Sequence, residues 1–158
     1  MSKPQTMHAR DAIRASAAEC YIIRNGERIN FMQAIEVKAE VEKKKTDVSI
    51  LGNVMKGNKA TGASGTGSCK FHYNTSMFRE MLMEYLNTGK DEYFDMQLTN
   101  EDETSSVGRQ TVILKDCNID GGIAALFNAD EELLEDEFDF TFESMLMPEK
   151  FKELQGAR

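Results

Sequence analysis

The chain has 158 residues, of which 41% are hydrophobic and 29% are charged, and its formal net charge is -8. This is the size of one ordinary domain with a globular composition, which excludes a wholly disordered chain. No stretch reaches the ~18 consecutive apolar residues that cross a bilayer, and the N-terminus lacks the apolar region of a secretory signal, so we expect a soluble protein.

The charge is unevenly distributed along the chain. Residues 1–80 contain 13 Lys and Arg against 8 Asp and Glu, whereas residues 81–158 contain 6 against 19. Because binding to phosphates depends on cationic groups, a net-acidic chain is a poor sequence-independent binder of nucleic acid. The three cysteines are far apart and odd in number, so we expect buried thiols rather than a disulfide framework.

The chain begins with a polar stretch, residues 1–16, which we interpret as a flexible arm. The first strong pattern is a hairpin, because Asn25 and Gly26 separate two β-branched and aromatic runs at 19–24 and 27–31. Asn-Gly supplies the two positive φ angles of a type I′ turn, which is typical of two-residue β-hairpins.

A strict alternation of apolar and charged residues begins at Ala34. It predicts a strand that is buried on one side and polar on the other. The lysines at 43–45 indicate a break, so we expect a long antiparallel pair over 34–54. Residues 56–68 contain four glycines but match neither a Walker A loop nor the dinucleotide fingerprint, and we expect a mobile surface loop there.

The rest of the chain predicts one helix and several strands. Apolar residues recur at helical spacing over 75–88, and Gly89 is expected to end that helix. Alternating patterns predict further strands at 69–73, 93–100, 109–118 and 137–143. The expected fold is therefore mainly β: an antiparallel β-sandwich or barrel of about seven strands with one flanking α-helix. Residues 17–147 would form a single domain, followed by a C-terminal tail at 148–158.

The sequence contains no recognisable catalytic or metal-binding pattern. Its only histidines are His8 and His72, which are too few for a His-rich zinc site and make a Ser-His-Asp hydrolase improbable. The acids of 130–143 form a run rather than a pair in an apolar setting, so we interpret them as a solvated face. We therefore predict a protein that is not an enzyme and that binds no cofactor or metal.

Several short stretches, taken together and in this order, carry a family resemblance. They are Ala9-Arg10-Asp11, Thr61-Gly62-x-x-Gly65-x-Gly67, Asn87-Thr88-Gly89-Lys90-Asp91, Gly108-Arg109, Cys117-x-Ile119-Asp120 and, after the acidic run, Phe138-Asp139-Phe140-Thr141-Phe142. With them the chain resembles the core tail tube proteins of contractile-tailed phages, including PBSX-like defective prophages. The family is also similar in fold to the Hcp tube protein of type VI secretion.

The resemblance implies a virion structural protein that folds as a β-sandwich with one flanking helix. Members of the family form hexameric rings that stack into a hollow tube inside a contractile sheath, a conduit for DNA or other cargo. The implied partners are further copies of the chain, the tail sheath protein, and the tape-measure and baseplate or terminator proteins. DNA would pass without specific binding, no membrane would be involved, and assembly would take place in the bacterial cytoplasm before the tube joins the phage-like particle tail.

Other functions remain open at this point. One is a small-molecule-binding β-barrel, which needs an apolar cavity and a monomer. Another is an enzyme that uses a carboxylate pair from the acidic half, and a third is an Hcp-like secretion tube. Rings or tubes in electron micrographs would favour a tube protein, whereas a compact monomer would favour the barrel or the enzyme.

The candidate assembly residues come from the charged strand and from the charge asymmetry. We expect four charged side chains of that strand to face the lumen: Glu36, Lys38, Glu40 and Glu42.

A head-to-tail ring contact need not be self-complementary, so we expect basic residues to meet acidic ones across it. The basic candidates are Lys43, Lys44, Lys45, Lys56 and Lys59. The acidic candidates are Asp130, Glu131, Glu132, Glu135, Asp136 and Glu137, with 101–103 as a second choice. The segments 34–54, 56–68 and 1–16 are expected to make the contacts between subunits.

Overall fold

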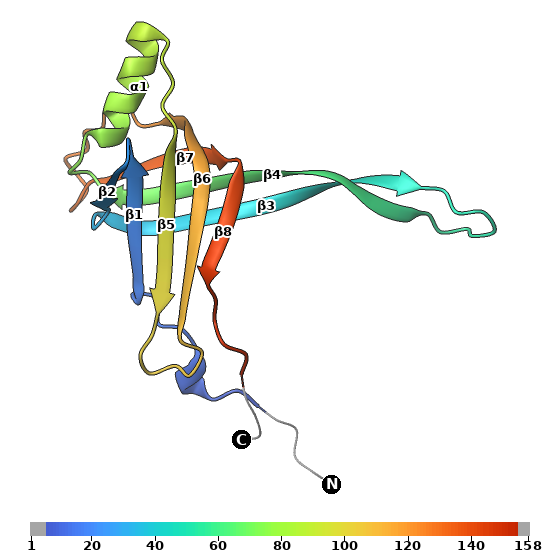
Figure 1. Cartoon of the computed structure of the whole chain (residues 1–158). Helices are drawn as coiled ribbons and strands as arrows, with labels where there is room; N and C mark the ends of the chain where they lie inside the picture. The colour runs from blue at the N-terminus through green and yellow to red at the C-terminus, as the bar shows by residue number, and fades with distance from the viewer. Residues whose placement is uncertain (1–5, 155–158) are drawn as a thin grey trace. The chain divides into compact units, whose positions relative to one another are not determined.

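The computed structural model describes residues 6–154, so parts of the expected arm and tail, residues 1–5 and 155–158, lie outside the described residues. These residues form one α-helix and eight strands, and the strands make an open, mainly antiparallel sheet (Figure 1). The elements are the 3-10 helix η1 (Ala9–Asp11), β1 (Ala18–Arg24), β2 (Glu27–Asn30), β3 (Ala34–Val48), β4 (Gly57–His72), α1 (Met77–Thr88), β5 (Phe94–Glu101), β6 (Arg109–Gly122), β7 (Glu135–Phe142) and β8 (Ser144–Glu149). The prediction of a mainly β fold with one α-helix is confirmed, with eight strands instead of about seven.

The described residues divide into two compact units, and strand β6 contributes to both. Unit 1 contains the residues up to Met32, Phe94–Lys115 and the residues from Met145 onward. Unit 2 contains Gln33–Tyr93 and Asp116–Ser144. Hydrogen bonding links the strands in the order β2-β1-β5-β6-β7-β4-β3, and β8 pairs with β6.

Unit 1 is built on the predicted Asn-Gly hairpin. Asn25 has φ 52° and Gly26 has φ 77°, as a type I′ turn between β1 and β2 requires. The other edge of β1 pairs with β5, where Ile22 lies opposite Met96. Both of these side chains are fully buried, and together with the buried Leu114 of β6 they contribute to the core of this unit.

Unit 2 is built on a long hairpin of β3 and β4 (Figure 1). The expected pairing within 34–54 is wrong, because β3 continues through the lysines as one strand and pairs with β4 over its whole length. The lysines do not end the strand, although the register shifts by one residue between Lys44 and Lys45: Lys43 lies opposite Ala63 and Lys45 opposite Ala60, with both faces exposed to water. The turn between the two strands lies at 49–56 instead.

The expected loop at 56–68 is also wrong, because these residues belong to β4, between β3 and β7. Two of its glycines have a packing reason for lacking a side chain. A Cβ on Gly65 would come within 2.6 Å of the Phe142 ring, and a Cβ on Gly67 would lie 2.8 Å from the backbone oxygen of Lys38 and overlap the Phe140 ring. The glycines therefore make room for aromatic side chains of β7 and do not mark a loop.

An aromatic cluster forms the core of unit 2. Phe138, Phe140 and Phe142 alternate along β7 with exposed or half-exposed polar residues and are all buried. Phe78 of α1 packs on Phe138 with 4.4 Å between ring centroids, and Phe71 of β4 lies 5.4 Å from Phe78. The helix is therefore anchored on one side of β4 and β7, and it ends at Gly89 as predicted.

Candidate assembly interface

One side of β3, β4 and β7 in unit 2 is a continuous polar surface, which we call the polar face. The register places the four lumen candidates opposite polar residues of β4: Glu36 pairs with Lys70, Lys38 with Ser68, Glu40 with Thr66 and Glu42 with Ser64. On the next strand, Lys70, Ser68 and Thr66 lie opposite Glu137, Asp139 and Thr141. All eleven residues therefore share one side of these strands, because directly opposed residues point the same way.

The polar face is anionic on balance. Five of its side chains are acids and two are lysines, so negative charge dominates. Lys38 donates to Glu40 at 2.9 Å, and this hydrogen bond, more than the charge of Glu40 itself, raises the pKa of the Lys38 ammonium. Neither side chain is buried, so the pair adds little to stability.

The opposite side of β3 is apolar but only partly covered. Val37 lies opposite the buried Cys69, where β7 also pairs with β4. Pairing between β4 and β7 ends at Gly65, which lies opposite Val41 of β3, and Val41 is 54% exposed. No residue of β3 is buried and Ile35 is 46% exposed, so the expectation of a strand buried on one side is wrong for β3 in the single chain.

The outer end of the β3–β4 hairpin, residues 43–59, forms a basic and apolar tip. The backbone N–H of Asn53 donates to the oxygen of Ile50 at 3.1 Å, which closes a turn with Leu51 at its apex. Leu51 and Val54 are fully exposed. The tip carries all five basic stacking candidates, every one of them exposed, and one acid, Asp47.

The acidic stacking candidates lie in different surroundings. Asp130, Glu131 and Glu132 are exposed in the segment before β7, where local hydrogen bonds tie Asn128 to Asp130 and Glu131. The remaining candidates follow in β7: Glu135 is exposed, Asp136 is buried and Glu137 belongs to the polar face. In the second-choice stretch, Glu101 and Glu103 are exposed and Asp102 is buried.

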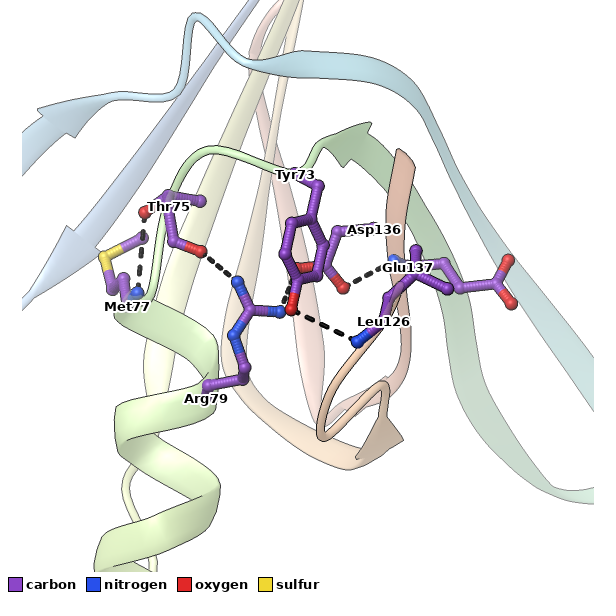
Figure 2. A network of polar contacts seen from close by, with 7 residues as sticks. All are labelled: Tyr73, Thr75, Met77, Arg79, Leu126, Asp136 and Glu137. Atoms are coloured by element: carbon purple, nitrogen blue, oxygen red, sulfur yellow. Dashed lines mark hydrogen bonds and ion pairs between the residues drawn. The ribbon is translucent and has the colours of Figure 1, made fainter. Parts of the chain in front are cut away.

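The buried Asp136 belongs to a polar network that fixes α1 against β7 (Figure 2). Arg79 of α1 pairs with its carboxylate, donates to the carbonyl oxygen of Thr75 and lies 4.4 Å over the Tyr73 ring. The Tyr73 hydroxyl in turn accepts a hydrogen bond from the backbone of Leu126. Because its carboxylate is buried in this network, Asp136 cannot form an ion pair with a lysine of a neighbouring copy unless its pair with Arg79 breaks.

In unit 1, residues of the expected arm are held by the turn between β5 and β6. Asp11 is buried, and its carboxylate accepts the backbone N–H and the hydroxyl of Ser106 at 2.9 and 2.7 Å. The Asp102 carboxylate accepts hydrogen bonds from the Thr104 hydroxyl and from the backbone N–H of Arg14. Both bonds hold the pKa of Asp102 below its usual value, and the bond from the Thr104 hydroxyl has the larger effect. We call the hydrogen bonds of Asp11 and Arg14 to this turn the latch. The sequence pattern did not indicate it, because Asp11 is a single acid in a polar stretch.

The described residues show surfaces rather than a reactive centre. Within 6–154, no group of three or more His, Cys, Asp or Glu could hold a metal ion. Cys20 is buried, which raises the pKa of its thiol to about 12 and keeps it in the unreactive neutral form. Among the same residues, no helix is long and apolar enough to cross a membrane.

Comparison with known proteins identifies the family. Residues 5–149 match the family described as phage tail tube protein. The chain is 39% identical to the phage-like element PBSX protein XkdM of Bacillus subtilis (strain 168) over 138 residues, covering 87% of this chain and 92% of that protein. This relative agrees with the resemblance to PBSX-like tube proteins seen in the sequence.

Two solved structures show the same fold. One belongs to the sheath-tube complex of the PVC extracellular contractile injection system in its extended state, with 12% identity, a TM-score of 0.61, and coverage of 86% of this chain and 90% of that one. The other is Hcp1 from Flavobacterium johnsoniae, with 11% identity, a TM-score of 0.50, and coverage of 86% and 99%. The chain therefore belongs to the phage tail tube protein family and is a structural protein of a tail tube.

Proposed function

We propose that this protein forms hexameric rings that stack into the inner tube of a contractile phage or phage-like tail, a conduit for DNA or other cargo. The observation that carries the proposal is the β3–β4 hairpin, whose apolar side and tip are left exposed by the single chain. Exposed apolar surface of this kind marks an interaction site on a water-soluble protein. Neighbouring copies would cover it in the tube.

The proposal extends to partners and location. The fold occurs in a sheath-tube complex, and related folds occur in a tube terminator and a baseplate, which supports a sheath protein, a terminator and a baseplate as partners here. A tape-measure protein would be a further partner. Assembly would take place in the bacterial cytoplasm, with no enzymatic step, no cofactor and no membrane, and residues 17–147 would act as one tube domain between an arm and a tail.

The polar face lines the lumen in this proposal. Its dominant negative charge would repel DNA phosphates, so a duplex would pass without adhering to the wall. Glu36, Lys38, Glu40 and Glu42 would contribute one row of charges from each subunit. The alternating register supports this orientation, because the residues from Glu36 to Glu42 on that side of β3, and the residues opposite them on β4 and β7, are polar.

Stacking would use the basic tip against an acidic surface of the adjacent ring. Each exposed ion pair contributes only about 0–1 kcal/mol, but the contact repeats around every ring. Of the acidic candidates, the exposed Asp130, Glu131, Glu132 and Glu135 are free of the Arg79 network and remain available, as do Glu101 and Glu103. The arm, residues 1–16, would add contacts between subunits.

The experiment combines size-exclusion chromatography with negative-stain electron microscopy of the full chain and of one variant. The variant replaces residues 49–56 with Asn-Gly, a two-residue turn that lets β3 and β4 remain paired. Deleting 56–68 is not suitable, because it would remove β4 from between β3 and β7. We expect rings and tubes from the native chain and folded, unassembled protein from the variant; a native chain that stays a compact monomer would contradict the proposal.

A further inference from the structure

We propose that the tip of the β3–β4 hairpin docks into an acidic groove beside α1 on a second copy of this chain. The groove lies within unit 2, where Met81, Leu82 and Tyr85 of α1 form an apolar wall. Three acids complete the lining: Asp91, Glu92 and Asp120. The inference rests on the proposed tube function and names the surface that receives the tip.

The tip needs a partner that is both apolar and acidic. Leu51 and Val54 are fully exposed, and the tip presents five exposed apolar side chains in all: Val48, Ile50, Leu51, Val54 and Met55. The segment contains five lysines and a single acid, Asp47, so the tip is strongly cationic. Burial of the apolar residues would drive docking, and the lysines would restrict it to an anionic surface.

The groove has the complementary character. Its lining contains three acids and no basic residue, and Lys90, the base next to it in sequence, pairs with Glu84. Its volume is about 250 Å³. That is room for an apolar side chain such as Leu51 together with the end of a lysine.

The exposed side of α1 extends the apolar wall of the groove. Leu86 is 81% exposed and Tyr85 is 51% exposed at the end of the helix nearest Asp91. The side chain of Asn118 donates to the backbone oxygen of Glu92 at 3.4 Å, which ties the acidic segment to β6. The groove is therefore already formed in the single chain.

The hairpin is long enough to reach a neighbouring molecule. Beyond Gly65, where β4 stops pairing with β7, seven further residue pairs extend the hairpin, or about 23 Å at ~3.3 Å per residue. Figure 1 shows this part of β3 and β4 running away from α1 within unit 2. The tip therefore meets the groove of another copy, in a heterologous contact that propagates from copy to copy.

Zero-length cross-linking of native tubes tests the contact, because a carbodiimide joins lysine ammonium groups to carboxylates that touch them. Tubes assembled from a mixture of ¹⁵N-labelled and unlabelled chains distinguish links between copies from links within one copy by mass spectrometry. We expect inter-copy links from the tip lysines to Asp91, Glu92 or Asp120. Links from these lysines to 101–103 or 130–137 instead, or no links from them in well-formed tubes, would overturn the inference and leave the proposed function standing.

A charge-reversal series provides a second readout. We expect Asp91→Lys with Asp120→Lys to slow tube formation, followed by light scattering, at least tenfold. Adding Lys56→Glu and Lys59→Glu to the same chain should restore the rate. The matched control, Glu27→Lys with Glu153→Lys, changes two exposed acids outside the proposed contacts, alters the charge equally and should leave the rate within twofold.

Circular dichroism verifies that each variant is folded. If the control slows assembly and the groove variant does not, the inference is wrong. If the native chain forms neither rings nor tubes, the proposed function fails, and the inference fails with it.

Discussion

At the scale of single residues, Gly65 and Gly67 leave space that the rings of Phe142 and Phe140 fill. This packing explains why a glycine-rich stretch forms a strand in the middle of the β3–β4–β7 layer. A small residue beneath an aromatic ring is a packing device of antiparallel sheets. In the sequence, the same composition is indistinguishable from a flexible loop, because the rings that cover the glycines lie more than 70 residues away.

The first prediction concerns Gly67→Ala. The added Cβ would meet the backbone oxygen of Lys38 at 2.8 Å as well as a ring, and backbone cannot move aside cheaply. We expect a loss of about 1–3 kcal/mol in the free energy of unfolding, measured by urea denaturation of unassembled chain. The control is Gly62→Ala, where nothing lies within 4 Å of the new atom; equal losses for the two variants would show that the packing argument is wrong.

The second prediction concerns Arg79→Met. Asp136 has a side-chain exposure of only 5%, so removing its partner leaves a buried carboxylate without its ion pair. We expect a cost of about 3–5 kcal/mol in the free energy of unfolding. Lys90→Met is the matched control, because its pair with Glu84 is 4.0 Å long and 75% exposed on the lysine side, and should cost about 0–1 kcal/mol. A cycle with Asp136→Asn in which the two single losses simply add would contradict the coupling.

At the scale of elements, the latch of unit 1 supplies the third prediction. Asp11→Ala removes the acceptor for two hydrogen bonds from Ser106, and bonds to a charged group contribute about 1.5–3 kcal/mol. We expect trypsin to cleave after Arg14 at least about tenfold faster, because cleavage follows the local opening of the segment. Glu103→Ala, an exposed change in the same turn, is the control. Unchanged cleavage in Asp11→Ala would mean that the latch does not hold the arm.

The elements that the sequence predicted correctly are those with a local physical signal. Asn25-Gly26 fixes its turn through two positive φ angles, and the helix over 77–88 shows its apolar spacing and ends at Gly89. The aromatic alternation of 138–142 likewise marks a strand with one buried side. None of these signals depends on residues far away in the sequence.

The errors lie where distant residues decide the structure. Strand β4 depends on the rings of β7, and the uninterrupted β3 depends on β4 as its partner. The charge alternation of β3 did predict a polar side, and the register extends it across β4 and β7. The acidic groove combines α1 with β6, residues 81–120, and no short pattern in the sequence indicates such a site.

At the scale of the whole molecule, the lumen proposal gives the fourth prediction. Replacing Glu36, Glu40 and Glu42 with lysine would turn the polar face cationic, so assembled tubes should retain several-fold more duplex DNA at low salt. The control reverses three exposed acids that do not belong to that face: Glu19, Glu27 and Glu153. Retention is measured by co-sedimentation of tubes with labelled DNA, and equal retention by the two variants would contradict the lumen assignment.

The most direct test of the account is a cryo-electron microscopy reconstruction of the assembled full chain. The account predicts a hollow tube of stacked six-membered rings in which Glu36, Lys38, Glu40 and Glu42 face the central channel. It further predicts that each β3–β4 hairpin contacts a neighbouring copy, which covers Leu51 and Val54. A reconstruction in which the polar face points away from the channel, or a chain that forms no tube, would contradict the account.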